Sequence, residues 1–325
     1  MRSHALTYAM LLAGTMLSCA PDAPHDNPLD PSSPGFANSG TVLGTVVLMS
    51  DPRIGIPSAE VMLAPSGPVY LTDASGGFAL TGLPAGTAVV IASKSGLLTD
   101  TVMITVQAGS SLPLEIQLDA LPVITQGQII TKKLDEYFPG PTYLAQISAD
   151  IGDPDGLTDL DSVWSVIEDL WVPMSYSPAS RLYEATVFDF DLPTNNLQWL
   201  VGKELRIVAR DVPGALAEAA NLYLTRIIEE SAVPVSPAAG DTTGPSPLLQ
   251  WNPAPVTFFH TLTLEIVRQD AGTQTTIWSQ ALVDAGLQEF QYAGSLTPGS
   301  YFWTVAVVDE FGNMCRSKPS SFLVN

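Results

Sequence analysis

The sequence has few cysteines, few histidines and little positive charge. It contains 2 cysteines and 3 histidines in 325 residues, and 33 acidic residues outnumber 13 lysines and arginines, for a formal net charge of −20. An acidic surface repels phosphate backbones, which argues against nucleic acid as a partner. Two cysteines can form at most one disulfide, so no disulfide framework is expected to hold the fold.

The residue patterns of common catalytic centres are also missing. The sequence has no Gly-x-Ser-x-Gly elbow, phosphate-binding loop, His-Glu-x-x-His pattern or cysteine metal cluster. His4 and His25 lie near the N-terminus, and His260 stands alone between apolar and polar residues without a catalytic motif. We therefore expect no enzymatic activity and no cofactor, apart from the calcium considered below.

The N-terminal residues form a short apolar run that ends at a cysteine. After Arg2, no charged residue occurs from Ala5 to Leu17, and Cys19 follows. The run is too short to span a bilayer and has the charge order of a secretory signal peptide. Met16-Leu17-Ser18-Cys19 resembles a bacterial lipoprotein signal, which implies cleavage after residue 18 and lipidation of Cys19. Ala20 is not the aspartate that retains such proteins in the inner membrane of enteric bacteria, so the resemblance favours the outer membrane.

Turn-forming residues divide the rest of the chain into segments. Residues 20–39 carry five prolines among small polar residues, which predicts a disordered tether. Beyond it, short apolar runs alternate with Gly, Pro and Ser turns about every ten residues, a pattern typical of β-sandwiches. We expect an all-β protein of three tandem β-sandwich domains, of immunoglobulin-like and transthyretin-like type. The expected segments are a signal at 1–18, a lipidated tether at 19–39, and domains at 40–120, 121–233 and 234–325.

The first domain contains a turn whose residues explain its shape. In Thr72-Asp73-Ala74-Ser75-Gly76-Gly77-Phe78, Asp73 is expected to accept hydrogen bonds from backbone amides beyond it, and glycine supplies positive φ. With this turn and the following Leu83-Pro84, residues 40–120 resemble a carboxypeptidase-regulatory-like (transthyretin-like) domain. The resemblance implies a structural module rather than a catalytic one.

The third domain resembles a fibronectin type III module. The matching segments include Pro247-Leu248-Leu249-Gln250-Trp251 and Tyr301-Phe302-Trp303-Thr304-Val305. The resemblance implies that Trp251, Tyr301 and Trp303 pack between the two sheets of a sandwich. Residues 121–233 contain a related hairpin, because Ile207–Gly214 parallels Val305–Gly312, each a strand that runs into Asp-x-x-Gly. The middle domain is therefore expected to be immunoglobulin-like.

The middle domain also carries a loop rich in aspartate. Asp153, Asp155 and Asp159 have roughly the spacing of calcium ligands, and Gly156 allows the backbone to bend between them. The loop lacks the flanking helices and the final glutamate of an EF-hand. Two interpretations stay open. The loop is either a calcium site or a solvated turn, in which Asp153 starts the turn and Asp159 caps a short helical turn before the next strand.

Trp164 and Trp171 are candidates for a glycan-binding platform. They lie an odd number of residues apart, so in a regular strand they face opposite sides and one is exposed. The alternative is that both pack within the sandwich core. Cys315 follows Gly312-Asn313-Met314 in an expected strand. We interpret it as a half-buried structural residue rather than a reactive thiol, since only Arg316 is a nearby cation in the sequence.

These features predict a lipid-anchored, non-catalytic protein of the bacterial cell envelope. It is expected to act as a scaffold, adhesion or protein-interaction module that meets an envelope protein through exposed sheet faces or loops. The alternative is a carbohydrate-binding lipoprotein that captures glycans at the cell surface. Exposure of the tryptophans separates the two hypotheses, because a glycan site needs a flat aromatic surface beside polar groups.

Overall fold

A computed structural model describes residue 27, residues 30–34 and residues 38–325. Cys19 and the predicted signal peptide lie outside these residues. Within them, no helix is both long enough and apolar enough to cross a membrane. The chain divides into two compact units, Met1–Ala120 and Leu121–Asn325. In the described residues, regular structure consists of strands and short 3-10 turns, as the all-β prediction requires.

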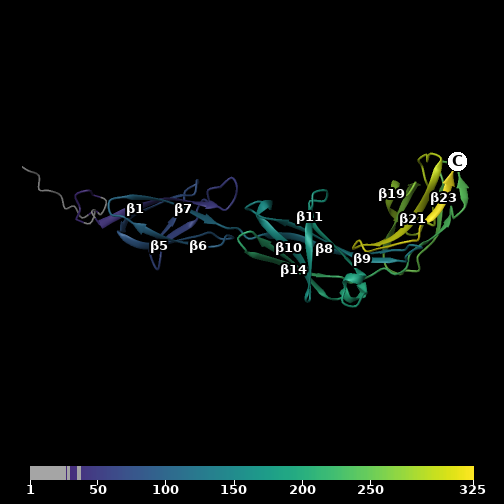
Figure 1. The fold of residues 1–325 in the computed structure, drawn as a ribbon, viewed down its shortest axis with the longest axis horizontal. Coiled ribbons are helices and arrows are strands. Elements are labelled where there is room, and N and C mark those ends of the chain that lie inside the picture. The colour runs from purple at the N-terminus through teal and green to yellow at the C-terminus, as the bar shows by residue number, and fades with distance from the viewer. Residues whose placement is uncertain (1–26, 28–29, 35–37) are drawn as a thin grey trace, which may run out of the picture. The chain divides into compact units, whose positions relative to one another are not determined.

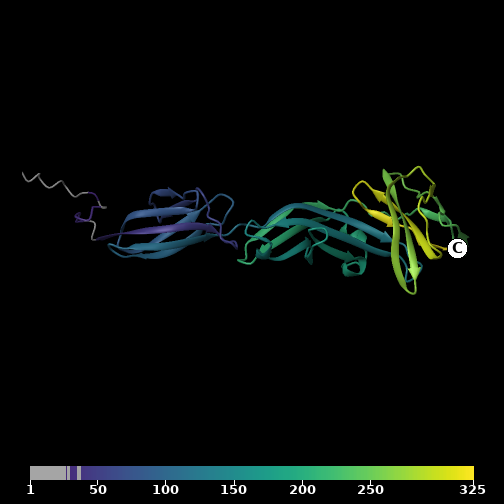
Figure 2. The same ribbon diagram turned by 90° about the horizontal axis from the view of Figure 1, so that it is seen from above.

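The first unit is a sandwich of two sheets. One sheet has the strand order β4-β1-β7 and the other β3-β2-β5-β6. Figures 1 and 2 show the strands of this unit from two directions, at the purple and blue end of the colour bar. Alternate side chains of the strands point inward and form one apolar core, in which Val46, Leu80 and Ile116 are fully buried. The strands are β1 (Ser39–Leu48), β2 (Glu60–Leu63), β3 (Val69–Leu71), β4 (Gly77–Pro84), β5 (Gly86–Ser93), β6 (Asp100–Val106) and β7 (Ser111–Leu118).

The turn before β4 has the predicted structure. Asp73 Oδ1 accepts hydrogen bonds from the amides of Ser75 and Gly77, each at 2.8 Å. The Ser75 hydroxyl also donates to Asp73, and together with these amides it lowers the pKa of the Asp73 carboxyl. Gly76 has a φ of 82°, which a residue with a Cβ rarely adopts. A local polar network therefore fixes this corner of the first sandwich.

The second unit contains two hydrophobic cores. The first core lies between β8, β9 and β12 on one side and β10, β13 and β14 on the other. Strand β11 belongs to both sides, because it pairs with β10 through Leu170–Met174 and with β12 through Ser175–Ser177. These strands are β8 (Val123–Leu134), β9 (Thr142–Gly152), β10 (Leu160–Ile167), β11 (Leu170–Ser177), β12 (Leu182–Phe188), β13 (Glu204–Asp211) and β14 (Leu216–Tyr223).

Strand β14 begins at Leu216, because the tight turn at Gly214 sets its register against β13. The connection before β13 contains the 3-10 helix η4 (Leu197–Leu200), whose two leucines enter the core.

The second core of this unit lies between a three-stranded sheet, β15-β17-β20, and the strands β22, β21, β18 and β19. Trp251, Tyr301 and Trp303 are buried in it, as the resemblance to a fibronectin type III module implies. The Trp303 indole donates a hydrogen bond to the Pro237 carbonyl at 2.9 Å. These strands are β15 (Val233–Ser236), β16 (Asp241–Thr243), β17 (Leu248–Asn252), β18 (His260–Asp270), β19 (Thr273–Asp284), β20 (Glu289–Gln291), β21 (Gly299–Asp309), β22 (Met314–Arg316) and β23 (Ser320–Val324).

One continuous sheet connects the two cores of the second unit. Lys132–Leu134 at the end of strand β8 pair in parallel with β22. Strand β8 therefore covers the edge that β22 would otherwise expose, which removes a site for unwanted strand pairing. Figure 1 shows β8 and β9 reaching from the first of these cores to the second.

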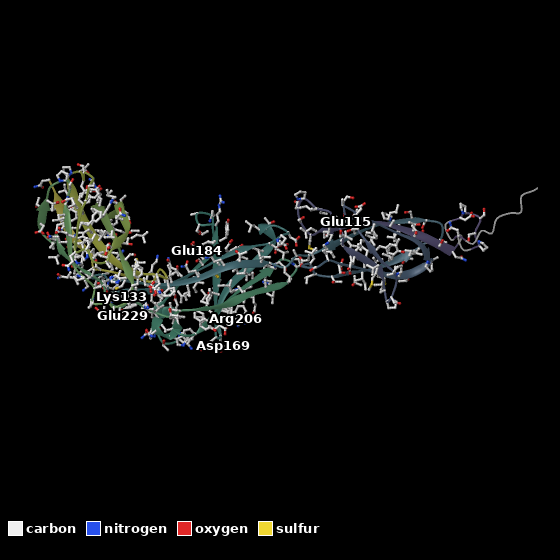
Figure 3. The ribbon with its side chains drawn as sticks, turned by 180° about the vertical axis from the view of Figure 1, so that it is seen from behind. Glu115, Lys133, Asp169, Glu184, Arg206 and Glu229 are labelled. Atoms are coloured by element: carbon white, nitrogen blue, oxygen red, sulfur yellow. The ribbon has the colours of Figure 1, made fainter. Side chains whose placement is uncertain are left out.

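Polar side chains reinforce this connection. The Asn313 side-chain oxygen accepts hydrogen bonds from the Thr131 amide at 2.9 Å and from the Thr131 hydroxyl at 3.1 Å. Lys133 lies beside Glu229, with 3.9 Å between Nζ and Oε2 (Figure 3). Because Asn313 and Thr131 are both buried, their hydrogen bonds fix how the two cores sit against each other.

Candidate metal centre

The aspartate-rich loop connects β9 to β10 at one end of the middle sandwich. Asp153 Oδ1 accepts a hydrogen bond from the Asp155 amide at 2.8 Å, and the Gly156 amide donates to the Asp153 carbonyl at 3.0 Å. Gly156 has a φ of 118°, a conformation that favours glycine. The chain then forms the 3-10 turn η2 (Leu157–Asp159) and enters β10. The loop thus reverses direction within a few residues.

This reversal brings the three predicted aspartates together. One carboxylate oxygen from each of Asp153, Asp155 and Asp159 lies within 4.8 Å of the others. Asp155 is buried, and the other two are half-buried. The capped-turn interpretation is correct for Asp153, which starts the turn. It is wrong for Asp159, which ends η2, while the N-cap position is Gly156 and has no side-chain cap.

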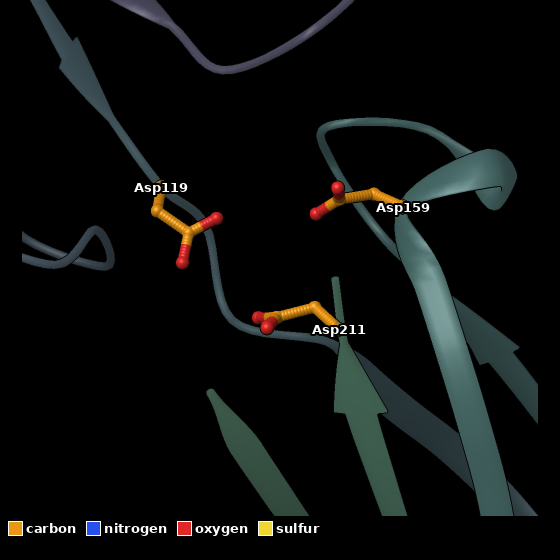
Figure 4. Close-up of side chains that lie close together, drawn as sticks. All are labelled: Asp119, Asp159 and Asp211. Carbon is orange, nitrogen blue, oxygen red and sulfur yellow. The ribbon is translucent and has the colours of Figure 1, made fainter. Parts of the chain in front are cut away.

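A further carboxylate, that of Asp211 at the end of β13, lies beside Asp159 of this loop. The pairing of β10 with β13 places Leu160 opposite Asp211, and the Val212 amide donates to the Asp159 carbonyl at 2.7 Å. A carboxylate oxygen of Asp211 lies within 4.8 Å of one from Asp159 (Figure 4). The sequence marks Asp211 only as the first residue of the Asp-x-x-Gly turn. Only the pairing of β10 with β13 places Asp211 beside the aspartate-rich loop, and the sequence pattern does not predict this pairing.

The electrostatics of the cluster reflect burial and mutual repulsion. Burial, followed by the charges of Asp155, Asp159 and Asp211, raises the pKa of Asp153 to about 6, and a hydrogen bond from the Asp155 amide acts in the opposite direction. Burial and the charges of Asp155 and Asp211 also raise the pKa of Asp159. The nearest arginine in sequence, Arg210, pairs instead with Asp161, at 2.9 Å between Nε and Oδ2. The cluster therefore concentrates negative charge.

The two candidate glycan-binding tryptophans lie on the same face, which corrects the prediction that they face opposite sides. The β10–β11 hairpin turns between them, so Trp164 pairs with Pro173 and Trp171 is its diagonal neighbour. Their rings contact edge to face, with centroids 5.8 Å apart. Trp171 is 54 % exposed, whereas the Arg210 guanidinium lies 5.3 Å from the centre of the Trp164 ring. One indole of the pair is thus accessible.

Cys315 is more buried than the sequence predicts. It lies in β22 with no exposed surface, and it belongs to the second core of its unit. Burial raises the pKa of its thiol to about 12, so almost no thiolate exists near neutral pH. This environment is that of a structural cysteine.

Comparisons with known proteins identify one domain. Residues 41–119 match the carboxypeptidase regulatory-like domain family. No curated protein matches the chain. Among solved structures, similar ones include the major pilin subunit of Bacillus cereus, with 11% identity, a TM-score of 0.29, and 88% of this chain and 96% of the pilin covered.

Two further solved structures are similar over much of the chain. Fibronectin(III)-like modules of Clostridium thermocellum CbhA share 14% identity, with a TM-score of 0.27, over 61% of this chain and 93% of theirs. The FN1–FN3 domains of chicken CNTN1 share 8% identity, with a TM-score of 0.32, over 83% of this chain and 92% of theirs. The matched domain is of a regulatory-like type, and no catalytic family is indicated.

Proposed function

We propose that this chain is a lipid-anchored, non-catalytic protein of the bacterial cell envelope, with the outer membrane as its site. In this role its β-sandwich domains serve as a scaffold or adhesion module that holds a protein partner. Two features support the proposal. The leader resembles a lipoprotein signal ending at Cys19, and the domain that matches a family is of a regulatory-like rather than a catalytic type.

The observation that carries the partner-binding role is an open groove on the first unit. The groove has a volume of about 890 Å³ and crosses the outer face of the β4-β1-β7 sheet. Leu43 is 53 % exposed at its centre, and the register places Ala79 and Pro113 on either side of it. Exposed apolar side chains gathered in a groove are typical of protein interaction sites. A protein with an apolar segment fits this surface better than a sugar.

A pull-down from envelope extract tests this surface. We expect the purified chain to retain a partner that the Leu43→Asp variant loses, because a charge in the centre of the groove opposes apolar docking. The matched control is Met103→Asp, which places the same charge on exposed β6 of the opposite sheet. Equal retention by both variants contradicts the role of the groove, and no specific partner at all contradicts the proposed function.

Fractionation of cells tests the anchor. The chain is expected in the outer-membrane fraction, because several acyl chains at one cysteine bind a membrane far more firmly than one. The Cys19→Ser variant is expected in the soluble fraction. If this variant stays in the membrane fraction, lipidation of Cys19 is not the anchor.

The exposure of Trp171 favours one second candidate function, the capture of glycans. An exposed indole provides a face on which a sugar ring can stack. Its neighbour Trp164 meets it at an interplanar angle of 77°, however, so the two rings do not form one flat platform. A glycan array with the wild-type chain and the Trp171→Ala variant tests this candidate. Binding that disappears in the variant replaces the scaffold proposal.

A further inference from the structure

We propose that Asp153, Asp155, Asp159 and Asp211 together bind one calcium ion in the middle sandwich. This site is separate from the groove and from the membrane anchor. Its failure therefore leaves the proposed function standing.

Asp211 is the observation that separates this cluster from an ordinary acidic loop. Asp211 is only 1 % exposed to solvent. Asp211 Oδ1 accepts hydrogen bonds from the amides of Gly214 at 2.7 Å and Ala215 at 2.6 Å, which hold the carboxylate in place. Asp211 Oδ2 is buried and accepts no hydrogen bond within the described residues. A buried carboxylate oxygen without a donor is unfavourable unless a cation neutralises it.

Two of the loop aspartates, Asp153 and Asp159, have the same requirement. Asp153 Oδ2 and Asp159 Oδ2 are also buried, and neither accepts a hydrogen bond within the described residues. None of the ion pairs formed in this part of the chain includes Asp153, Asp159 or Asp211. The compensating positive charge must therefore come from solution.

The donor set and its spacing select calcium among the common ions. All four side chains offer carboxylate oxygens, which are the ligands of hard cations rather than of zinc. Calcium binds oxygens at about 2.3–2.6 Å, so two ligands on opposite sides of the ion lie up to about 5 Å apart. The oxygens of Asp153, Asp155 and Asp159 fall within 4.8 Å of one another and fit around such an ion. Magnesium needs shorter bonds, of about 2.0–2.1 Å, and strict octahedral geometry, and it keeps several waters.

A hydrogen bond between the loop and β13 explains how calcium binding is expected to stabilise the middle sandwich. The Val212–Asp159 hydrogen bond fixes the loop to the end of β13, and the register pairs the start of β10 with Asp211. An ion held between the loop and Asp211 therefore connects the β9–β10 turn to the β13–β14 hairpin. Calcium is expected to stabilise the middle sandwich by binding only the folded state.

Calorimetric titration and thermal unfolding of the purified, calcium-depleted chain test the site. We expect one calcium ion per chain, bound with a Kd of about 10⁻⁴–10⁻³ M, the range of extracellular modules. At a free calcium concentration tenfold above Kd, Tm is expected to rise by about 3–6 °C. Magnesium at the same concentration is expected to raise Tm by less than half as much. A flat titration and an unchanged Tm overturn the proposal.

Two variants and a control locate the ion. Asp211→Asn keeps the shape of the side chain and its oxygen acceptor, and it is expected to weaken calcium binding at least tenfold. Asp155→Ala is expected to abolish the Tm response. The control is Asp161→Asn, an exposed neighbour that pairs with Arg210, and it should bind calcium as the wild type does. Circular dichroism in chelator shows whether each variant folds. Normal calcium binding by folded Asp211→Asn, or an equal loss in Asp161→Asn, overturns the assigned ligands.

Discussion

The hairpins at Asp211 and Asp309 have similar turns but different surroundings. In each, one carboxylate oxygen accepts two backbone amides, those of Gly214 and Ala215 for Asp211 and those of Phe311 and Asn313 for Asp309. The second oxygens differ. Asp309 Oδ2 accepts the Asn313 side-chain amide at 3.0 Å and lies 3.4 Å from Arg226. Asp211 Oδ2 has no hydrogen-bond donor in the described part of the chain.

The difference shows how one turn can serve two purposes. In both hairpins, one carboxylate oxygen accepts backbone amides of the turn. These hydrogen bonds fix the shape of the turn. The surroundings of the second oxygen differ between the two hairpins. At Asp309 an arginine and an amide complete the environment, so the site belongs to the folded scaffold. At Asp211 the neighbouring Asp159 carboxylate adds negative charge, and the calcium ion that we propose completes the environment.

The largest effect is expected from disrupting the hairpin at Asp309, whose carboxylate has its partners within the chain. Asp309→Ala removes the acceptor for three hydrogen bonds and the partner of Arg226. We expect a loss of about 2–4 kcal/mol in the free energy of unfolding, because buried donors are left without partners. Urea unfolding measures the loss with calcium and with chelator. A loss below about 1 kcal/mol, or its recovery on addition of calcium, contradicts the contrast between the two hairpins.

A smaller effect, with a sign that depends on calcium, is expected from Asp159→Asn. In chelator, one of several mutually repelling carboxylates becomes neutral, so the free energy of unfolding should rise by about 0.5–1 kcal/mol. In calcium, the variant should show no further gain, whereas the wild type gains about 1.4 kcal/mol at tenfold Kd. Thermal unfolding in both buffers gives the comparison. Destabilisation in chelator would show that Asp159 has a structural role instead.

The pH dependence of the calcium-free chain sharpens the comparison further. The folded-state pKa of Asp153, about 6, lies above its ordinary value of 3.8, so the fold favours the neutral carboxyl. The stabilisation is present at low pH and disappears as the pH rises through this interval, because the unfolded chain releases the proton more readily. Tm of the wild type should therefore fall more steeply from pH 4 to pH 6.5 than Tm of Asp153→Asn. Parallel curves would remove Asp153 from the electrostatic argument.

The last prediction concerns the reactivity of the Cys315 thiol. This residue lies in β22, the strand that follows the turn at Asp309. Its thiol is buried, and a pKa of about 12 leaves very little thiolate at pH 8. In a Cys19→Ser background, a thiol reagent should label the native chain more than about 100-fold slower than the urea-unfolded chain. Mass spectrometry of the labelled chain measures both rates. Rapid native labelling would indicate that β22 opens readily.

Features determined by neighbours in sequence were predictable. The amide acceptor Asp73 and the glycines of its turn form one local unit, so their pattern gives their geometry. Asp153, Asp155 and Asp159 lie on one loop, and their convergence follows from their spacing around Gly156. The burial of Trp251 and Trp303 follows from the resemblance to a sandwich family.

Features that depend on strand pairing were not predictable from these patterns. Asp211 reaches the cluster only because β13 pairs with β10. Trp164 and Trp171 share a face because a hairpin turns between them, and the alternation rule holds only within one strand. Strand β8 pairs with β22 although the sequence separates them widely, and no local signal marks that contact.

The pairing of β8 with β22 also orders events during synthesis. The hydrogen bond from the Thr131 amide to Asn313 joins residues 182 positions apart. At about 5–20 residues per second, β8 is made roughly 10–40 s before its partner strand. For that time the end of β8 presents an unpaired edge, which is a template for association with other chains. A chain that stops before Met314 retains this edge permanently, so truncated products are expected to aggregate or to require a chaperone, whereas the finished chain closes the edge itself.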